Sequence, residues 1–481
     1  MREMFDIVVV GSGAGGGVVA AELALGGRRV LLLEAGRHLT ADDFRRFEAK
    51  ANHDLYWPMR FAPLPGGDVV AFLSGKSVGG STTINTKVAL RAHERDIEKW
   101  HAASGLTNDE GQAFTLADLE PFYDRVEKVL TVRVRDDWGK CVHTARAGFQ
   151  ALGADLEPVH SYTDAKCMSY GSCLQGCPTD GGKSTMNTYI ARALAAGGLE
   201  LRTGVQAQRV LIEGSGERAH ATGVEYLDAQ GHLQVARGRF VVVAAGALNT
   251  SLLLLRSGLT NPAIGRHVGL HPVRLVHGLF DDVQDAYRVY PISAHCMQHQ
   301  VDADGGFVLE ASTIMDPIAF ATTSRDEHGP LWGQRLVDAL RAYRRWVGVL
   351  AMVNDENNGA IALDANGQER ITVDFQASEH ARLDAALDFS RRVLQAAGAR
   401  QVCWTGIIST HTQGGCRMGD DPARAVVDRN GRTHEVQGLY VGDSALLPRT
   451  LSVNPSLTIM ALATRLAMHL EGELAQTPAP H

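Results

Sequence analysis

The start of the chain alternates between short apolar runs and a glycine-rich turn. Residues 7–10 form a continuous apolar run rich in β-branched side chains, as expected for a strand buried on both faces of a parallel sheet. Residues 18–25 are apolar and rich in alanine, which predicts a helix, and residues 30–33 predict a second strand that ends at Glu34. This order predicts a strand–helix–strand unit with parallel strands.

Later segments carry periodic patterns of their own. Residues 238–258 repeat the order of buried strand, small-residue turn and helix. Residues 359–375 predict two strands joined by a turn at 364–367. Residues 379–399 have apolar positions at helical spacing and end near glycine, which predicts a long amphipathic helix. Together with the alternating runs after residue 280, these segments predict an antiparallel sheet with flanking helices.

The turn after the first apolar run has the spacing G-x-G-x-x-G, formed by Gly11, Gly13 and Gly16. The first glycine permits the tight turn, the second lets the backbone approach a pyrophosphate, and the third lets the helix pack on the strand. The helix N-terminus would stabilise phosphate charge, and Glu34 is placed to accept hydrogen bonds from ribose hydroxyls. Strand, turn, helix, strand and acid together predict a dinucleotide site.

Composition and charge narrow the class of protein. With 481 residues the chain is too long for one simple domain, and its net charge of −7 lacks the basic footprint of a nucleic-acid-binding protein. We expect no signal peptide, because the N-terminal apolar run leads directly into the glycine turn, and no membrane span, which needs about 20 apolar residues. Seven cysteines, an odd number, do not suggest a secreted disulfide framework. We therefore expect a cytoplasmic protein, or a periplasmic one only if a partner exports it.

Further blocks stand in a fixed order along the chain. They are SGKSVGGSTTINTKVALR at 74–91, HTQGGCRMGDDP at 411–422 and GLYVGDSALLPRTLSVNPSLTIMALATRLAMHL at 438–470. With the N-terminal unit they resemble the glucose–methanol–choline (GMC) family of FAD-dependent oxidoreductases. The resemblance implies an α/β fold with a Rossmann-like FAD-binding domain (1–275 and 405–481, with a cysteine-containing insertion at 140–190). This domain would be interleaved with a substrate-binding cap domain (276–404) of antiparallel sheet plus helices.

The resemblance also implies which residues contact FAD. They come from both ends of the chain and from its middle: Gly11, Gly13, Ala14, Gly16, Glu34, Ala35, Gly79, Gly80, Ser81, Asn85, Val205, Ala245, Gly246, Asp443, Asn454 and Pro455. Some relatives attach the flavin covalently through a histidine in the 74–91 block. Ile84 stands at that position here, so we expect non-covalent FAD.

His411 and Asn454 match the catalytic pair of the family. Oxidation of an alcohol removes the hydroxyl proton while a hydride leaves the carbon for the flavin N5. An imidazole with a pKa of about 6.5 can accept that proton at neutral pH. An asparagine can orient the substrate oxygen without competing for the proton. His267 and His271, in GRHVGLHP, fit a recurring family stretch and are expected to be structural.

Cys167, Cys173 and Cys177 are crowded together with the spacing C-x5-C-x3-C. Three thiolates could hold an iron–sulfur cluster that lacks one iron. The spacing resembles the catalytic subunits of some bacterial sugar dehydrogenases, in which a [3Fe-4S] cluster passes electrons from FAD to a cytochrome. The same segment also resembles the long-chain alcohol oxidase branch, in which a cluster is not assured. Redox-active thiols or a disulfide, buried structural thiols, and zinc with His160 or His143 remain open.

These features predict an FAD-dependent dehydrogenase that oxidises a sugar or another primary or secondary alcohol, with His411 as the base. The resemblance to the cluster-containing enzymes implies a cytochrome or other protein acceptor and a small chaperone subunit as partners. The alternative is an alcohol oxidase that reduces O₂ to H₂O₂, with structural cysteines and no cluster. A non-redox flavoprotein lyase and an electron-transfer subunit without a substrate pocket are further alternatives.

Overall fold

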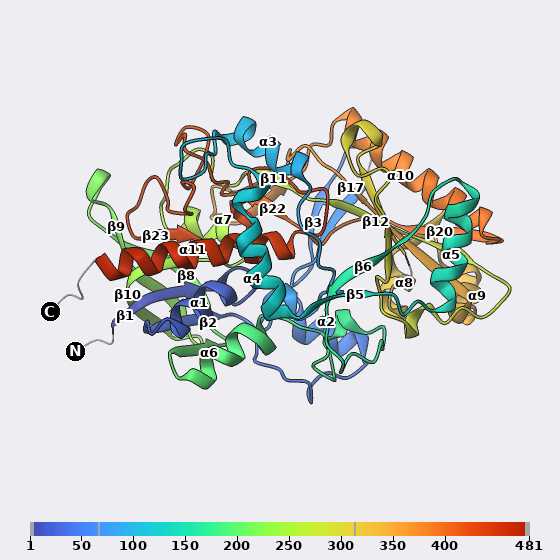
Figure 1. The fold of residues 1–481 in the computed structure, drawn as a ribbon, viewed down its shortest axis with the longest axis horizontal. Helices are drawn as coiled ribbons and strands as arrows, with labels where there is room; N and C mark the ends of the chain where they lie inside the picture. Colours follow the sequence, from blue (N-terminus) through green and yellow to red (C-terminus); the bar gives the residue numbers. More distant parts are fainter. Residues whose placement is uncertain (1–3, 66–67, 312–313, 477–481) are drawn as a thin grey trace.

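The computed structural model describes residues 4–65, 68–311 and 314–476. Its two large β-sheets lie side by side in Figure 1, one next to the chain termini on the left and the other on the right. The C-terminal helix, in red, lies beside the N-terminal elements, in blue (Figure 1). Segments from both ends and from the middle of the chain therefore build the left-hand half together.

The first sheet has the strand order β7-β2-β1-β10-β9-β8, and β23 also pairs with β10. Its strands are β1 (Met4–Val10), β2 (Val30–Glu34), β7 (Leu199–Thr203), β8 (Gln206–Glu213), β9 (His220–Leu227), β10 (Leu233–Val243) and β23 (Leu439–Val441). The pairs around β1 are parallel, with Val8 opposite Leu31 and Val241, whereas β8 and β9 pair antiparallel. Val8 and Val9 have no exposed surface, because both faces of this sheet are covered.

Helices from five parts of the chain support this sheet. α1 (Gly16–Leu25) packs against α11 (Ser456–Gln476), which also contacts α4 (Glu120–Leu130), and α6 (Ala191–Ala196) lies against α1. α7 (Ala247–Arg256) follows β10 and packs against β8. Since α1 and α7 both start directly after parallel strands, their N-termini lie at the carboxyl edge of the sheet.

The second sheet is almost entirely antiparallel, with β4 and β21 as its parallel pair, and has the order β16-β15-β20-β12-β17-β14-β13-β6-β5, extended by β21, β4 and β3. Its strands are β3 (Arg60–Pro63), β4 (Val69–Phe72), β5 (Val132–Arg135), β6 (Glu157–Tyr162), β12 (Pro272–Leu279), β13 (Ala294–Cys296), β14 (Phe307–Ala311), β15 (Ser324–Asp326), β16 (Gly329–Pro330), β17 (Trp346–Val353), β20 (Gln401–Thr405) and β21 (Ile407–Ser409). α10 (Ala377–Ala396) packs on β12 and β17 and against α5 (Lys140–Ala151). Several strands of this sheet therefore lie well outside residues 276–404. The domain boundaries at residues 276 and 404 remain a prediction.

Shorter elements connect the two halves. β11 (Arg266–Gly269) pairs with β22 (Gln413–Gly415), and β18 (Ala360–Leu363) pairs with β19 (Glu369–Thr372). The remaining helices of the described chain are α2 (Glu48–Leu55), α3 (Glu94–Ser104), α8 (Pro317–Thr323) and α9 (Gly333–Arg341). None of the helices in residues 4–65, 68–311 and 314–476 is both long and apolar enough to cross a membrane.

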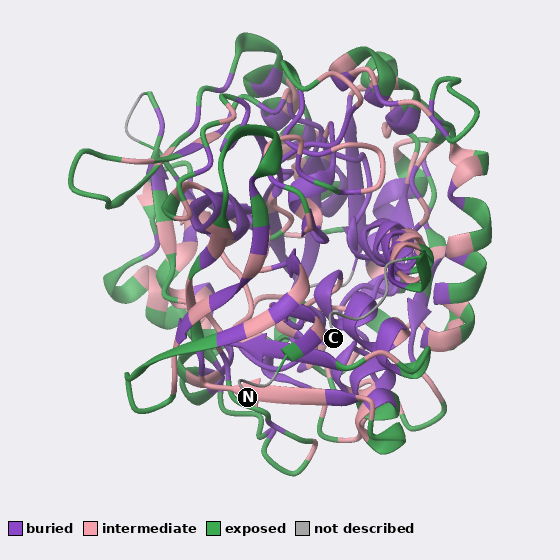
Figure 2. Ribbon diagram, turned by 90° about the vertical axis from the view of Figure 1, so that its left-hand side faces the viewer, coloured by how far each residue is buried: buried purple, intermediate pink, exposed green. Residues whose placement is uncertain are grey.

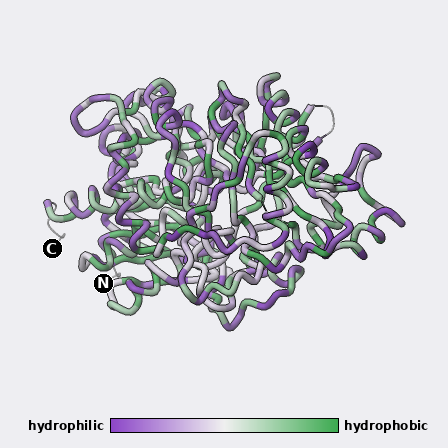
Figure 3. Tube along the Cα trace, turned by 45° about the vertical axis from the view of Figure 1, so that its right-hand side comes forward, coloured by the Kyte–Doolittle hydropathy of each residue, from purple (hydrophilic) through white to green (hydrophobic). Residues whose placement is uncertain are grey.

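The buried residues are concentrated around the two sheets. Buried residues fill the interior strands and helices in Figure 2, while exposed residues lie on outer loops and outward helix faces. Hydrophilic segments likewise lie mainly on the periphery in Figure 3. One apolar cluster surrounds β1, α1 and α11, and a second one lies between the antiparallel sheet and α10. Each half therefore has its own core.

The predicted elements are confirmed. The strands expected at 7–10 and 30–33 are β1 and β2, and the helix between them is α1. The segment 238–258 forms the end of β10 and α7, the two strands at 359–375 are β18 and β19, and the amphipathic helix is α10. The α/β fold with a parallel sheet and an antiparallel second sheet matches the prediction.

Candidate active site

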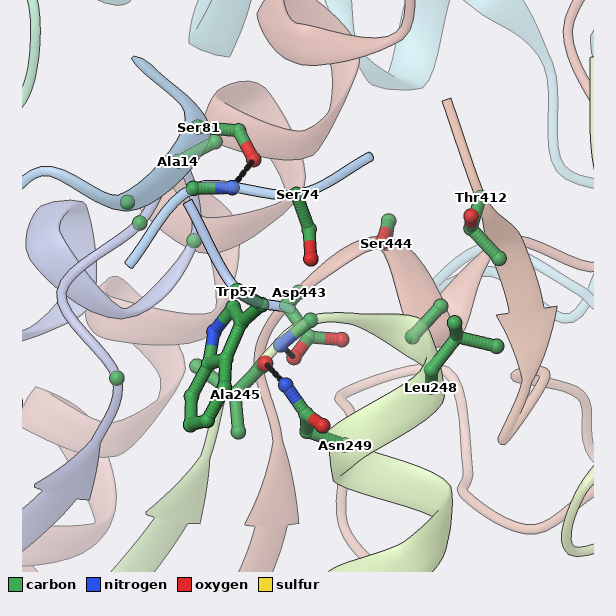
Figure 4. Close-up of a pocket in the computed structure, with 18 of the residues that line it drawn as sticks. Ala14, Trp57, Ser74, Ser81, Ala245, Leu248, Asn249, Thr412, Asp443 and Ser444 are labelled. Carbon is green, nitrogen blue, oxygen red and sulfur yellow. Dashed lines mark hydrogen bonds between the residues drawn. The ribbon is translucent and has the colours of Figure 1, made fainter. Parts of the chain in front are cut away.

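A cavity of about 330 Å³ opens at the carboxyl edge of the parallel strands. Its wall includes Gly11 after β1, Ala35 after β2, Ala244 after β10 and Asp443 after β23. Ligands of open parallel sheets bind at this edge. Trp57, Ser81, Asn249 and Thr412 also line the cavity, and Figure 4 shows how they surround it.

The glycine turn is packed as tightly as its motif predicts. Gly11 has a φ of +94°, and a Cβ there would lie 2.3 Å from the carbonyl oxygen of Ala244. A Cβ at Gly16 would lie 2.0 Å from the carbonyl oxygen of Gly11, so this position holds the helix against the turn. At Gly13, by contrast, a Cβ would meet no atom within 4 Å, because this residue lines the cavity. The backbone at Gly13 is therefore open to a phosphate group.

Glu34 is held rigidly at the end of β2. Its Oε2 accepts hydrogen bonds from the backbone N–H and the hydroxyl of Ser12, at 3.0 and 2.6 Å, and its Oε1 accepts from the N–H of Gly36 at 2.7 Å. Burial raises the pKa of Glu34, and these hydrogen bonds oppose that effect. A carboxylate has about four acceptor positions, so capacity remains for a hydroxyl group in the cavity that Glu34 lines.

Asp443 ties the second strand–turn–helix unit to the C-terminal segment. Its Oδ2 accepts from the N–H of Gly246 at 2.7 Å and from the hydroxyl of Thr250 at 2.6 Å. Its Oδ1 accepts from the N–H of Ala445 at 2.8 Å. The carboxylate thereby fixes the N-terminus of α7 at the cavity wall.

The loop at residues 79–85 closes another side of the cavity. The N–H of Gly79 donates to the Ser12 hydroxyl at 2.9 Å, which links this loop to the first glycine turn. Ser81 accepts from the N–H of Gly75 at 3.0 Å (Figure 4). Behind the loop, the buried ammonium of Lys87 donates to the carbonyl oxygens of Thr82 and Thr83, and burial lowers its pKa to about 8.

Most of the sequence-predicted cofactor residues come together on this wall. Those that line the cavity are Gly11, Gly13, Ala14, Glu34, Ala35, Gly80, Ser81, Asn85, Val205, Ala245, Gly246, Asp443 and Pro455. Gly16, Gly79 and Asn454 are not on it: the two glycines support the turns, and Asn454 is buried just before α11. Open backbone at Gly13, a helix N-terminus and a fixed carboxylate fit an extended dinucleotide. Their roles as cofactor contacts remain predictions.

One side of the cavity wall is formed by residues that no sequence motif predicts. The guanidinium of Arg60, on β3, donates to both carboxylate oxygens of Glu369 at 2.8 and 3.1 Å and to Oδ1 of Asn249 at 2.7 Å. All three residues line the cavity together with Trp57 and Arg256. No motif marks these positions, because β3, α7 and β19 meet only in the folded chain.

His411 lies on the cavity wall between β21 and β22. Burial lowers the pKa of its imidazole to about 4, so the ring is neutral at pH 7 and can accept a proton. This value is below the one that the sequence suggests, because the ring is desolvated. Asn454 is also buried, and its Oδ1 has no hydrogen-bond partner within the described chain.

His271 lies directly behind His411. The Nδ1 atoms of the two rings are 3.3 Å apart, so one ring donates and the other accepts. His271 is completely buried and has a φ of +48°. Burial lowers its pKa well below the usual value, so the pair is uncharged at neutral pH. The expectation that His271 is structural stays a prediction, and the structure adds that its ring contacts the candidate base.

The three clustered cysteines come together in the folded chain. Cys167, Cys173 and Cys177 are free thiols that line a second cavity of about 20 Å³, which holds about one water molecule. Burial raises the pKa of Cys173 to about 12 and so favours its thiol form, whereas a bound metal would itself deprotonate the sulfur. Among the described residues, no group of three His, Cys, Asp or Glu side chains is placed to hold a metal ion. The described residues therefore give no support for an iron–sulfur cluster or for the zinc alternative.

Known proteins are similar to this chain in both sequence and fold. The long-chain-alcohol oxidase FAO4B of Arabidopsis thaliana is 29% identical over 95% of this chain and 66% of its own length. The uncharacterized GMC-type oxidoreductase y4nJ of Sinorhizobium fredii is 27% identical over 98% of this chain and 97% of its own. The chain thus spans about two thirds of the length of the plant relative and nearly all of the bacterial one.

Solved structures match the whole fold. Pyridoxine 4-oxidase from Mesorbium loti superposes with a TM-score of 0.74 and 18% identity, covering 97% of this chain and 99% of its own. A fungal aryl-alcohol oxidase superposes with a TM-score of 0.71 and 16% identity, covering 98% and 100%. Profiles of the GMC oxidoreductase family match residues 5–273 and 355–463. With the glycine turn, the loop at 79–85 and the C-terminal blocks placed around one cavity, the chain belongs to the GMC oxidoreductase family.

Proposed function

We propose that this protein binds FAD non-covalently in the 330 Å³ cavity and oxidises a primary alcohol, with His411 as the base. The observation that carries the proposal is a neutral imidazole on the wall of a cavity whose other walls fit a dinucleotide. Bound FAD would supply the acceptor for the hydride that leaves the carbinol carbon. The remaining chemistry is proton transfer, which the side chains of this chain can perform.

The two candidate catalytic residues divide that chemistry. His411 accepts the hydroxyl proton, and His271 behind it keeps the ring in a fixed orientation. Asn454 orients the substrate oxygen through its amide, which cannot take the proton itself. The low pKa of His411 means that the ring stays ready to accept a proton down to about pH 4.

An apolar surface adjoins the cavity and indicates the substrate class. The apolar face consists of Val273, Leu275, Val308, Met352 and Ile408, on strands β12, β14, β17 and β21 of the second sheet. Leu73 packs against it and also lines the cavity, so the two are continuous. This surface suits an aliphatic chain better than a sugar, whose hydroxyls would lose their hydrogen bonds there. We therefore propose a long-chain aliphatic alcohol, in line with the names of the plant relatives.

We further propose that molecular oxygen is the electron acceptor, so that one alcohol and one O₂ yield one aldehyde and one H₂O₂. Among the described residues no side-chain group is placed to hold a metal cluster, and the matched plant relatives are named oxidases. The dehydrogenase reading, with a cytochrome or other acceptor and a chaperone subunit, is the competing hypothesis. It requires iron, which the oxidase does not.

The test begins with the FAD-loaded protein under anaerobic conditions. Loss of flavin absorbance is followed after mixing with 1-butanol, 1-octanol, 1-dodecanol or glucose. We expect kcat/KM to rise roughly fourfold for each added methylene that the apolar face buries, and glucose to react least. Absence of bleaching with every alcohol would refute alcohol oxidation.

Two further measurements identify the electron acceptor. Oxygen consumption and peroxide formation should match in a one-to-one ratio for the oxidase. Iron and acid-labile sulfide per flavin should be near zero in protein purified without oxygen. About three irons per flavin, the number in a [3Fe-4S] cluster, would instead establish the dehydrogenase reading.

A further inference from the structure

Large apolar side chains are exposed together outside the cavity, on three segments that are far apart in the sequence. The exposed patch consists of Phe47 before α2, Ile318 in α8, and Met168, Tyr170 and Leu174 in the loop that carries the clustered cysteines. Phe47 and Met168 are 60% and 64% exposed. Apolar residues exposed singly are ordinary, whereas a contiguous group of them marks an interaction surface.

Contacts between the three segments hold the exposed patch together. The backbone N–H of Ile318 donates to Oε2 of Glu48 at 2.6 Å, which places α8 against the first turn of α2. The hydroxyl of Tyr56, just after α2, donates to the carbonyl oxygen of Leu174 at 2.8 Å. α2 therefore contacts both α8 and the cysteine loop.

Three exposed arginines, Arg45, Arg46 and Arg288, lie along the exposed patch. The guanidinium groups of Arg46 and Arg288 lie 5.1 and 5.7 Å from the ring centroid of Tyr287. A Cβ at Gly171 would lie 2.1 Å from the carbonyl oxygen of Tyr287, so Tyr287 joins these arginines to the cysteine loop. Arg45 and Arg46 donate hydrogen bonds to backbone carbonyl oxygens, which do not neutralise their charge.

Two nearby acidic side chains are already engaged elsewhere. Asp43 accepts from the backbone N–H of Thr40 at 2.8 Å. The buried carboxylate of Glu48 accepts from the N–H groups of Ile318 and Ala319 in α8. Positive charge beside the exposed patch therefore remains for an anionic partner.

The exposed patch also reaches the apolar face of the second sheet. Met315 packs against that face and against the apolar cluster around Phe320 of α8. Ile318 belongs to the same helix and is exposed. Since Leu73 joins the apolar face to the cavity wall, apolar side chains extend from the protein surface at α8 to the cavity.

We propose that the exposed patch docks on a lipid bilayer with anionic headgroups and that the alcohol substrate enters from the bilayer beside α8. The inference rests on the proposed function, because a long-chain alcohol partitions into lipid rather than water. Aromatic and aliphatic side chains flanked by arginines suit a surface that lies in the membrane interface. Tyr170 fits this region, because its ring is apolar and its hydroxyl is polar.

Co-flotation of the FAD-loaded protein with vesicles tests the docking. One set of vesicles is phosphatidylcholine alone, and the other contains about 30% phosphatidylglycerol as the anionic lipid. We expect stronger binding to the anionic vesicles, with the difference lost at about 0.5 M salt, because surface charge is then screened. If the protein binds neither kind of vesicle, the proposal is wrong.

Substitutions locate the docking surface. Phe47→Asp combined with Met168→Asp should lower the vesicle partition coefficient roughly tenfold or more, because both side chains would bury apolar area in the bilayer. Leu233→Asp, at a similarly exposed position of β10, is the matched control and should bind as the wild type does. Unchanged Tm and FAD content would show that the double variant is folded. Wild-type binding by the double variant would overturn the proposal.

The arginines are tested separately from the apolar side chains. Arg45→Gln and Arg46→Gln should each weaken binding to anionic vesicles roughly fivefold, the usual contribution of one basic residue at such a surface. Binding to neutral vesicles should not change. Arg218→Gln, an exposed arginine on the far side of the parallel sheet's β8–β9 hairpin, is the control. Equal binding of all three variants to anionic vesicles would exclude charge as a reason for docking.

Sedimentation of the protein without lipid distinguishes a bilayer from a second copy of the chain. We expect the same mass for the wild type and the double variant. A dimer that dissociates in the double variant, with no vesicle binding by the wild type, would show that the exposed patch pairs two copies. That result would overturn the proposal.

Turnover tests the entry of substrate from the bilayer. With 1-dodecanol supplied in anionic vesicles, the double variant should lose kcat/KM by about the factor that it loses in vesicle binding. With 1-butanol, which is soluble in water, it should react as the wild type does. Equal losses with both alcohols, or no loss with either, would overturn entry beside α8. Vesicle binding without oxidation of any alcohol would refute the proposed function and leave the docking surface established.

Discussion

The two sheets of this protein are assembled in different ways. Around β1, one neighbouring strand is reached by a short local step, because β1, the glycine turn, α1 and β2 follow one another within residues 4–34, although the other neighbour, β10, comes from residues 233–243. In the second sheet, all the neighbours of β12 come from distant segments. β21, for example, pairs with β12, which lies more than 120 residues earlier, and with β4, which lies still nearer the N-terminus.

The two sheets also contribute different kinds of groups to the site. The first sheet supplies backbone groups and fixed carboxylates at one edge, which suit a cofactor of constant shape. The second sheet supplies the apolar face, which Leu73 joins to the cavity wall. His411 lies between β21 and β22, where the two halves meet. We therefore expect substitutions in each half to affect different measurements.

His411→Ala should have the largest effect, because it removes the base at the junction of the two halves. We expect kcat to fall roughly 10²- to 10⁴-fold, with FAD content unchanged. The measurement is the anaerobic flavin-reduction rate with 1-dodecanol. His232→Ala, in the β9–β10 hairpin with a side chain that is 76% exposed, is the control. If His411→Ala reduced the flavin at the normal rate, His411 would not be the base.

His277→Leu tests the second sheet alone. His277 is buried beside Phe320, neither ring nitrogen has a partner in the described chain, and burial lowers its pKa to about 3. The unfolded chain, with a histidine pKa of about 6.5, binds this proton first, so the wild type loses stability as the pH falls below 6.5. Relative to pH 8, the leucine variant should gain about 2 kcal/mol at pH 5, a roughly 30-fold change in the unfolding constant.

Urea unfolding at pH 5 and pH 8 measures this difference. His328→Leu is the control in the same sheet, since its side chain is 74% exposed. FAD binding at pH 8 should be unchanged in both variants. Equal pH dependence in the wild type and His277→Leu would show that His277 is not the group that titrates.

Gly16→Ala tests the first sheet alone. An added Cβ would lie 2.0 Å from the carbonyl oxygen of Gly11 and would push the helix from the turn. We expect FAD affinity to fall roughly tenfold or more, as overpacking typically costs about 1–3 kcal/mol. Titration of the apoprotein by flavin fluorescence measures this. Gly472→Ala, in α11 with open space around it, should leave affinity unchanged. Equal affinities in the two variants would argue against the turn as a phosphate cradle.

Arg60→Gln should have the smallest effect, because it loosens a contact that spans both halves. Arg60 joins β3 to Glu369 of β19 and Asn249 of α7 across the cavity wall. Partly exposed ion pairs contribute about 0.5–1 kcal/mol, so FAD should dissociate roughly two- to fivefold faster. Arg209→Gln breaks a similar pair with Glu225 on the β8–β9 hairpin and should not change this rate. Stopped-flow dilution gives both values.

Much of this fold could be predicted from local patterns. The strand–turn–helix–strand unit, the segment at 238–258 and α10 each carry their signal within about 30 residues. The positions of Gly11, Glu34 and Asp443 on one cavity wall follow from motifs at the ends of parallel strands. The long-range pairing of β4 with β21 could not be predicted from the sequence, because short strands carry little information about their partners.

The sequence by itself determined the dinucleotide unit and the type of candidate base, because a glycine turn and an imidazole act through local geometry and intrinsic chemistry. Only the tertiary structure decided that His271 contacts His411 and that Arg60 lines the cavity with Glu369. It also showed that the three clustered cysteines line one small cavity. The physical reason is desolvation: whether a histidine, thiol or carboxyl is charged depends on which distant segments bury it.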